Sequence, residues 1–215
     1  MRTTFFRFPD DDPPSGSSDT SSDGTTTTTA APFSPISYDV PLIPQPNKLA
    51  CWAASMAMIL GYKRQQSVDP ESLANEVGAS LRTSYSWELL ESVRDHFGFQ
   101  SVIEVPSDAC VYYPPQQWHD WLENYGPLWF TFIWASGGSH ALVLKGISGD
   151  GTESGTYFEI QNPWDINTTF DSDAVDFNPA NNGTSQHMPF LNFANTFGDL
   201  GYDAAHANFR IMYLP

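Results

Sequence analysis

Residues 45–55 read QPNKLACWAAS, and the helix that this stretch leads into organises the predicted fold. From Leu49 to Leu60 nearly every residue is apolar or small, and Gly61 follows the run. A helix that is apolar on all sides belongs in the middle of a domain. We therefore expect a buried central helix that ends at Gly61 and carries Cys51 in its first turn.

Cys51 stands where the start of a helix would activate a thiol. Unpaired N–H groups and the positive end of the helix dipole stabilise a thiolate, which is the nucleophilic form of cysteine. Gln45, six residues earlier, is close enough to offer its amide to an oxyanion on a carbonyl that Cys51 attacks. The alternative is that Cys51 is a small buried residue of an apolar helix, as most free cysteines are.

Composition limits the classes of protein and partner. A chain of 215 residues with 40% hydrophobic content can form one domain with a full core. Its net charge of −16 argues against nucleic acid and against an anionic membrane surface as partners. The sequence contains neither an apolar run of membrane-spanning length nor a hydrophobic signal-peptide stretch. We therefore expect secretion by a route that needs no signal peptide, or a cytoplasmic location.

The two cysteines do not predict a disulfide. If Cys51 is a nucleophile, Cys110 has no partner within the chain. This suits a reducing compartment, and it also suits a secreted bacterial protein that does not depend on disulfides.

The N-terminal stretch differs in composition from the rest of the chain. Residues 9–32 are rich in Pro, Asp, Ser, Gly and Thr and carry too few apolar side chains to offset the entropy of ordering. We expect residues 1–37 to be a disordered acidic tail or linker, and residues 38–215 to form a single domain.

Helix signals come first along the domain and strand signals follow. Capping residues and helical periodicity predict helices over residues 69–78, 86–98 and 114–126. Aromatic and aliphatic runs separated by Gly/Ser turns predict strands over residues 128–135, 141–147, 157–161 and 209–214. Residues 165–186 read as a long polar connection, and residues 188–197 as a short helix near the end. This order predicts an α+β domain, with a helical N-terminal half packed on an antiparallel sheet.

A nucleophilic cysteine needs a base, and His140 is the best placed of the five histidines. It begins a predicted strand directly after the flexible SGGS of residues 136–139, so its ring can lie at a sheet end beside a cleft. His96 and His119 fall within predicted helices among polar neighbours and are expected at the surface. His187 and His206 belong to no motif.

The sequence QNPWD at residues 161–165 offers a partner for that base. Asn162 closes the predicted strand 157–161, which should pair with the His140 strand, and its amide can accept the imidazole N–H. Asp165, three residues on, could serve the same purpose. Pro163 ends the strand. Trp164 either shields this hydrogen bond from water or is a core aromatic residue.

Together these motifs resemble the papain-like cysteine peptidases. The match rests on Gln45 with Cys51-Trp52, on the Gly126-Pro127 turn, on the strand from His140 to Gly146, and on Asn162-Pro163-Trp164. The interval of 140 − 51 = 89 residues between cysteine and histidine resembles the compact bacterial branch. That branch includes bacteriocin-leader peptidases, staphylococcal secreted peptidases and effectors of plant pathogens. Its usual third residue is Asp, which leaves both Asn162 and Asp165 open.

The resemblance implies a papain-like fold and a cysteine endopeptidase with Cys51, His140 and Asn162 as the triad. It implies Gln45 as oxyanion donor, Trp52 and Trp164 at the substrate, and no metal or cofactor. The expected partners are a protein or peptide substrate and a cognate inhibitor or immunity protein. The protein is expected to be a monomer and to act as a secreted bacterial effector or toxin. Two alternatives remain at this point. One is a peptidoglycan amidase or other acyl-transfer enzyme with the same triad, and the other is a catalytically silent peptide-binding domain.

Overall fold

The computed structural model describes residues 32–84, 86–104, 113–133, 139–165, 180–195 and 210–215. Within these ranges the helices are α1 (Cys51–Arg64), α2 (Pro70–Glu76), α3 (Trp87–Phe97), α4 (Pro115–Tyr125) and α5 (Phe190–Phe193). The strands are β1 (Ile36–Ser37), β2 (Gln100–Glu104), β3 (Leu128–Ile133), β4 (Ser139–Gly149), β5 (Thr156–Asn162), β6 (Thr184–Pro189) and β7 (Arg210–Tyr213). No helix in these ranges is long and apolar enough to cross a membrane.

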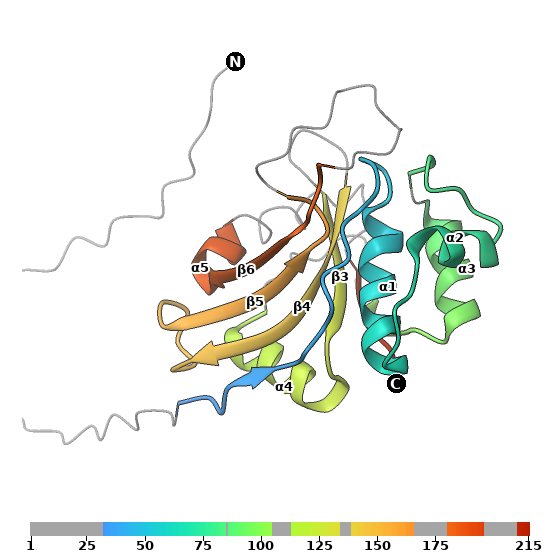
Figure 1. The fold of residues 1–215 in the computed structure, drawn as a ribbon. Coiled ribbons are helices and arrows are strands. Elements are labelled where there is room, and N and C mark those ends of the chain that lie inside the picture. The colour runs from blue at the N-terminus through green and yellow to red at the C-terminus, as the bar shows by residue number, and fades with distance from the viewer. Residues whose placement is uncertain (1–31, 85, 105–112, 134–138, 166–179, 196–209) are drawn as a thin grey trace, which may run out of the picture.

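All seven strands join one antiparallel sheet, in the order β2-β7-β3-β4-β5-β6, with β1 paired to β4 beyond the end of β3 (Figure 1). The predicted hairpin across residues 148–155 connects β4 to β5. The expected α+β class and the expected pairing of the His140 and Asn162 strands are confirmed.

Alternation along the strands divides the sheet into two buried faces. One face packs against α1, α2 and α3, and its sheet residues include Trp129, Ala141, Val143 and Met212. The other packs against α4 and α5, and its sheet residues include Phe130, Leu142, Leu144, Phe158, Ile160 and Ile211. Both faces are apolar because helices cover both, and the central strands therefore have few polar positions.

Helix α1 is the buried central helix that the sequence predicts. Every residue from Cys51 to Gly61 is buried. The predicted end at Gly61 is wrong, because the helix continues to Arg64 and ends at Gln65, which has a left-handed backbone with φ 53°. Gly61 instead allows close packing, since a Cβ there would lie 3.0 Å from the Gln66 carbonyl oxygen.

The next three helices agree closely with the prediction. Asp69 caps α2 by accepting the Ser72 N–H at 2.8 Å, and Ser86 caps α3 by accepting the Leu89 N–H at 3.3 Å. Gly98 ends α3 with φ 79°, a conformation that favours glycine.

His119 on α4 is buried, so the prediction of a surface position is wrong for this residue. Its ring stacks on Phe33 with 4.6 Å between centroids, and its Nε2 lies 3.1 Å from the Ser34 carbonyl oxygen. Residues 33–37, which the predicted boundary places in the tail, thus pack on the domain and include strand β1. His96 is exposed as expected, and His206, Cys110 and residues 1–31 lie outside the described residues.

Strands β2 and β6 were not predicted. Residues 184–189 alternate between half-buried and exposed positions, and β6 pairs with β5 from Thr184 to Pro189. The strand is polar because it lies at the sheet edge and has one exposed face. Its composition therefore resembles that of a loop. The short helix expected within residues 188–197 is present as α5.

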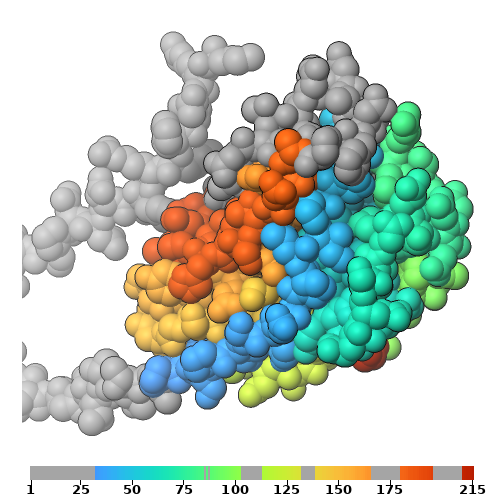
Figure 2. Space-filling view, viewed as in Figure 1, coloured from blue at the N-terminus to red at the C-terminus, as the bar shows by residue number. Residues whose placement is uncertain are grey.

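The segment from Tyr38 to Ala50 crosses the molecule between the sheet and the helical layer, and is blue in Figures 1 and 2. Two hydrogen bonds attach it to the sheet, from the Tyr38 N–H to the Lys145 carbonyl at 2.9 Å and from Gln161 Nε2 to the Val40 carbonyl at 2.8 Å. These contacts fix the path of the chain that leads to Gln45 and then into α1.

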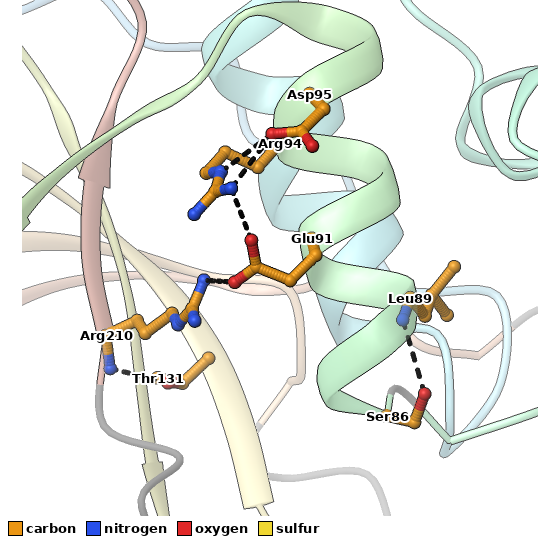
Figure 3. A network of polar contacts seen from close by, with 7 residues as sticks. All are labelled: Ser86, Leu89, Glu91, Arg94, Asp95, Thr131 and Arg210. Carbon is orange, nitrogen blue, oxygen red and sulfur yellow. Dashed lines mark hydrogen bonds and ion pairs between the residues drawn. The ribbon is translucent and has the colours of Figure 1, made fainter. Parts of the chain in front are cut away.

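A charged network joins α3 to the sheet (Figure 3). Arg210 of β7 is 3% exposed and forms an ion pair with Glu91, which also pairs with Arg94. The Arg210 N–H donates to Thr131 Oγ1 at 3.1 Å. A buried guanidinium depends on its carboxylate partner, because water cannot replace that partner.

Removal of that carboxylate should destabilise the fold. For Glu91→Gln we expect the free energy of unfolding to fall by about 2 kcal/mol, because the buried Arg210 keeps its charge while Glu91 becomes a neutral amide, which weakens a charge-assisted hydrogen bond. For Arg94→Gln we expect a loss below about 1 kcal/mol, because the pair of Glu91 with Arg210 remains. Urea denaturation followed by circular dichroism measures both values. Equal losses in the two variants would contradict this account of the network.

Candidate active site

The predicted cysteine, histidine and asparagine lie at the same end of the molecule. Cys51 is the first residue of α1, His140 the second residue of β4, and Asn162 the last residue of β5. In Figure 1 the start of α1, the start of β4 and the end of β5 lie at the upper end of the sheet. The antiparallel pairing of β4 with β5 brings a strand start and a strand end to one edge.

Cys51 is 3% exposed and packs beside the strand that carries the predicted base. Burial raises the pKa of the Cys51 thiol to about 11, while backbone groups of Ala141, Trp52 and Cys51 itself act in the opposite direction by hydrogen bonding. The expectation of a helix-stabilised thiolate is therefore not met in this state. The helix N-terminus does favour the charge, but the loss of hydration outweighs it.

His140 forms a hydrogen bond with Asn162. The distance from His140 Nε2 to Asn162 Oδ1 is 2.8 Å, and both side chains are buried. Asn162 Oδ1 also accepts the Trp164 N–H at 2.9 Å. Because the amide oxygen accepts both bonds, the His140 ring carries its hydrogen on Nε2. Nδ1 is then the nitrogen that can exchange a proton with a thiol.

Burial also lowers the pKa of His140 to about 4, although the hydrogen bond to Asn162 acts in the opposite direction. The raised pKa of Cys51 and the lowered pKa of His140 have the same physical cause, because both charged forms lose hydration. At neutral pH both shifts favour the neutral forms, a thiol on Cys51 and an uncharged imidazole on His140.

Trp164 packs its ring at 80° to the imidazole of His140, with 6.0 Å between the ring centroids. The side chain is half-buried. Of the two alternatives for this residue, the edge contact fits the one in which Trp164 covers the bond between His140 and Asn162.

Gln45 is 1% exposed and lies in a compact turn just before α1. Its Nε2 donates to the Asn47 carbonyl at 2.7 Å, and its backbone N–H donates to the Pro163 carbonyl at 2.9 Å. The second contact joins the turn to the residue that follows Asn162. One hydrogen of Nε2 is used by Asn47, which leaves the second for another acceptor.

Asp165, the alternative third residue, follows the turn after β5. Its backbone N–H donates to Asn181 Oδ1 at 2.7 Å, and the hydrogen bond of His140 Nε2 is accepted by Asn162 Oδ1. Asn181 is 6% exposed and was not predicted. Its signal in the sequence is weak, because it lies in an Asn/Asp/Gly-rich stretch that reads as a loop.

Trp52 does not lie where the sequence analysis expects it. Its side chain is 0% exposed and belongs to the core between α1 and the sheet. A fully covered indole has no surface to offer a substrate, so the expected substrate contact is corrected to a core position. The residue next to a helix N-terminus points inward here because α1 is apolar on all sides.

The described side chains include no group of three or more His, Cys, Asp or Glu that could hold a metal ion. The described residues at this end of the sheet include a thiol, an imidazole and carboxamide groups. These groups suit nucleophilic attack on a carbonyl, followed by acyl transfer.

An α+β fold with a buried helix that begins at a cysteine, beside a His–Asn pair on adjacent strands, is the arrangement of papain-like cysteine proteases. Residues 34–181, more than half of the chain, match the family described as "Papain-like cysteine protease AvrRpt2". The chain belongs to this family, and the resemblance inferred from its motifs is confirmed. A search of curated proteins found no match.

The buried neutral state of His140 should make the fold sensitive to acid. The unfolded chain takes up this proton near pH 6.5 and the folded chain near pH 4, so stability falls as pH decreases between these values. Between about pH 7 and about pH 5 we expect His140 to account for a loss of about 2 kcal/mol. Urea denaturation of the wild-type protein and of His140→Gln at both values measures the contribution, because other titrating groups cancel in the difference. The same pH dependence in both proteins would contradict it.

Proposed function

We propose that this papain-like cysteine protease is an endopeptidase that acts through Cys51, His140 and Asn162, with Gln45 as oxyanion donor. The observation that carries the proposal is the 2.8 Å hydrogen bond from His140 Nε2 to Asn162 Oδ1. Because Nε2 is bonded to Asn162, Nδ1 is the nitrogen that would take the proton of Cys51, which packs against the strand of His140. Cys51, His140 and Asn162 would act as nucleophile, base and orienting amide, the three roles that acyl transfer requires.

The first step would form a thioester. His140 Nδ1 takes the proton of the Cys51 thiol while the sulfur attacks the carbonyl carbon of the scissile peptide bond. The oxyanion accepts hydrogen bonds from the Cys51 backbone N–H and from the second hydrogen of Gln45 Nε2. His140 then gives its proton to the leaving amine, the C–N bond breaks, and the acyl group stays on Cys51.

The second step would release the acid. A water molecule gives a proton to His140 and attacks the thioester carbonyl, and the same oxyanion donors stabilise the intermediate. The C–S bond then breaks, and the thiolate recovers its proton from His140. Throughout, Asn162 accepts the Nε2–H and keeps the ring in one orientation.

The burial of Cys51 and His140 supports this scheme, because it favours proton transfer between the two residues over ionisation of either one alone. The free thiol and imidazole stay neutral because each charge alone is poorly hydrated. The two charges arise together when the proton moves, and each then stabilises the other in a site of low dielectric. The oxyanion donors are also more effective where water is excluded.

The substrate class follows from the family, since a protease acts on proteins. We propose in addition that the substrate is a protein of another cell, as for the plant-pathogen effectors that the sequence resembles. Mass spectrometry of products from a peptide library and a denatured protein would give the cleavage sequence. Release of soluble fragments from purified cell wall, with the peptides left intact, would favour the amidase alternative instead.

Cys51→Ala should abolish hydrolysis, because no other atom at the site forms the thioester. The matched control is Cys110→Ala, which removes the other cysteine and should leave the rate of hydrolysis within about twofold. The assay is turnover of a peptide selected from the library, with all variants purified in the same way. Comparable turnover by Cys51→Ala would remove Cys51 as nucleophile.

Gln45→Ala should lower kcat by roughly 10–1,000-fold, which is the usual effect of one oxyanion donor. Alkylation of Cys51 by iodoacetamide forms no oxyanion, so its rate should change much less. Gln66→Ala, an exposed glutamine after α1, serves as the control and should not change kcat. If kcat is unchanged in Gln45→Ala, the glutamine is not part of the oxyanion site.

A further inference from the structure

Asn181 joins the two segments that carry the proposed catalytic groups. Its Nδ2 donates to the Gln45 carbonyl at 2.7 Å and to the Pro163 carbonyl at 2.9 Å. Gln45 is the proposed oxyanion donor, and Pro163 directly follows Asn162 in the chain. One side-chain nitrogen therefore contacts the backbone of both segments.

The oxygen of the same amide binds two backbone N–H groups of the chain that follows Asn162. Asn181 Oδ1 accepts the Asp165 N–H at 2.7 Å and the Gly183 N–H at 3.2 Å. A carboxamide has two hydrogens on nitrogen and two lone pairs on oxygen, and all four are used. The donors and acceptors around it also fix its orientation, since a flipped amide would face two carbonyls with oxygen.

The hydrogen bonds from Asn181 to Gln45 and Pro163 are buried, and a backbone hydrogen bond joins the same two segments. Asn181 is 6% exposed, and the Gln45 N–H donates to the same Pro163 carbonyl that accepts from Asn181. Water is therefore poorly placed to replace the side chain. The separation between the Gln45 turn and the turn after Asn162 depends on this cluster of backbone groups.

We propose that Asn181 is a positioning residue of the active site, which sets the distance between the oxyanion donor and the His140–Asn162 pair. The proposal rests on the function proposed above. Asn181 itself contacts no reacting atom, and it acts through the backbone of Gln45 and Pro163. A shift of these segments would weaken oxyanion stabilisation, because that interaction depends on placement within a fraction of an ångström.

The test replaces the nitrogen that joins the two segments. Asn181→Asp keeps the shape of the side chain, removes both N–H donors and sets a carboxylate oxygen against two carbonyls. The matched control is Asn182→Asp, the same change at an exposed neighbour whose Nδ2 bonds locally to the Ala180 carbonyl. Asn181→Ala removes the contacts without adding charge, and it carries the test if Asn181→Asp does not fold.

The readout is kcat per reactive thiol. In a Cys110→Ala background iodoacetamide labels Cys51 alone, the labelled thiol is counted by mass, and peptide turnover is divided by that number. We expect kcat per thiol to fall roughly 10–100-fold in Asn181→Asp and less in Asn181→Ala, with KM changed by less than about threefold. Asn182→Asp should match the wild-type protein. A purely structural role would lower the amount of folded protein and leave kcat per thiol unchanged.

The outcomes separate this proposal from the function on which it rests. If the wild-type protein cleaves peptides and both Asn181 variants keep its kcat per thiol, the positioning role is overturned and the protease function stands. If neither variant folds, the role is structural and the proposal is likewise overturned. If the wild-type thiol is alkylated but no peptide is cleaved, the proposed function fails first.

Discussion

The complete burial of α1 is the constraint on which the rest of the structure depends. The residues from Cys51 to Gly61 leave no polar stripe, so every side of the helix must be covered. The sheet covers one side, α2 and α3 another, and the segment from Tyr38 to Ala50 passes between the layers. The start of such a helix necessarily lies inside the molecule, and Cys51 lies there with it. The position of the proposed nucleophile is thus a result of core packing.

The same burial changes the electrostatics that helix geometry alone would suggest. Near a solvated helix start, backbone N–H groups stabilise a thiolate. Here those groups are present and still lower the pKa of Cys51, but the loss of hydration has the larger effect. His140 responds to the same environment in the opposite direction, since its charged form is a cation. A neutral pair that can become an ion pair is the combined result.

The sequence predicted the parts of the fold whose signals are local. Caps at Asp69 and Ser86 mark their helices correctly, because a capping hydrogen bond lies within three residues. The buried strands also have a local signal. Helices cover both of their faces, so each strand is a short, nearly continuous apolar run in the sequence. The edge strand β6 and the burial of His119 were missed, because each depends on a partner distant in sequence.

The site shows the same division between local and distant information. The Gln45–Cys51 spacing and the strand positions of His140 and Asn162 were visible as motifs. Asn181 was not, since its four hydrogen bonds go to backbone groups of other segments and impose no pattern on the neighbouring sequence. The motif predicts Trp52 at the substrate, whereas the apolar surroundings of α1 bury its side chain in the core.

The distances along the chain between the site residues have a consequence for folding. Cys51 and His140 are 140 − 51 = 89 residues apart, so bringing their segments to one end of the molecule requires the closure of a long loop. Contacts of this separation slow folding, because the entropy of loop closure is lost before the contacts stabilise the chain. The reactive site is therefore a property of the fully assembled domain, and the environment of a single sulfur atom reports whether the whole chain has reached its native state.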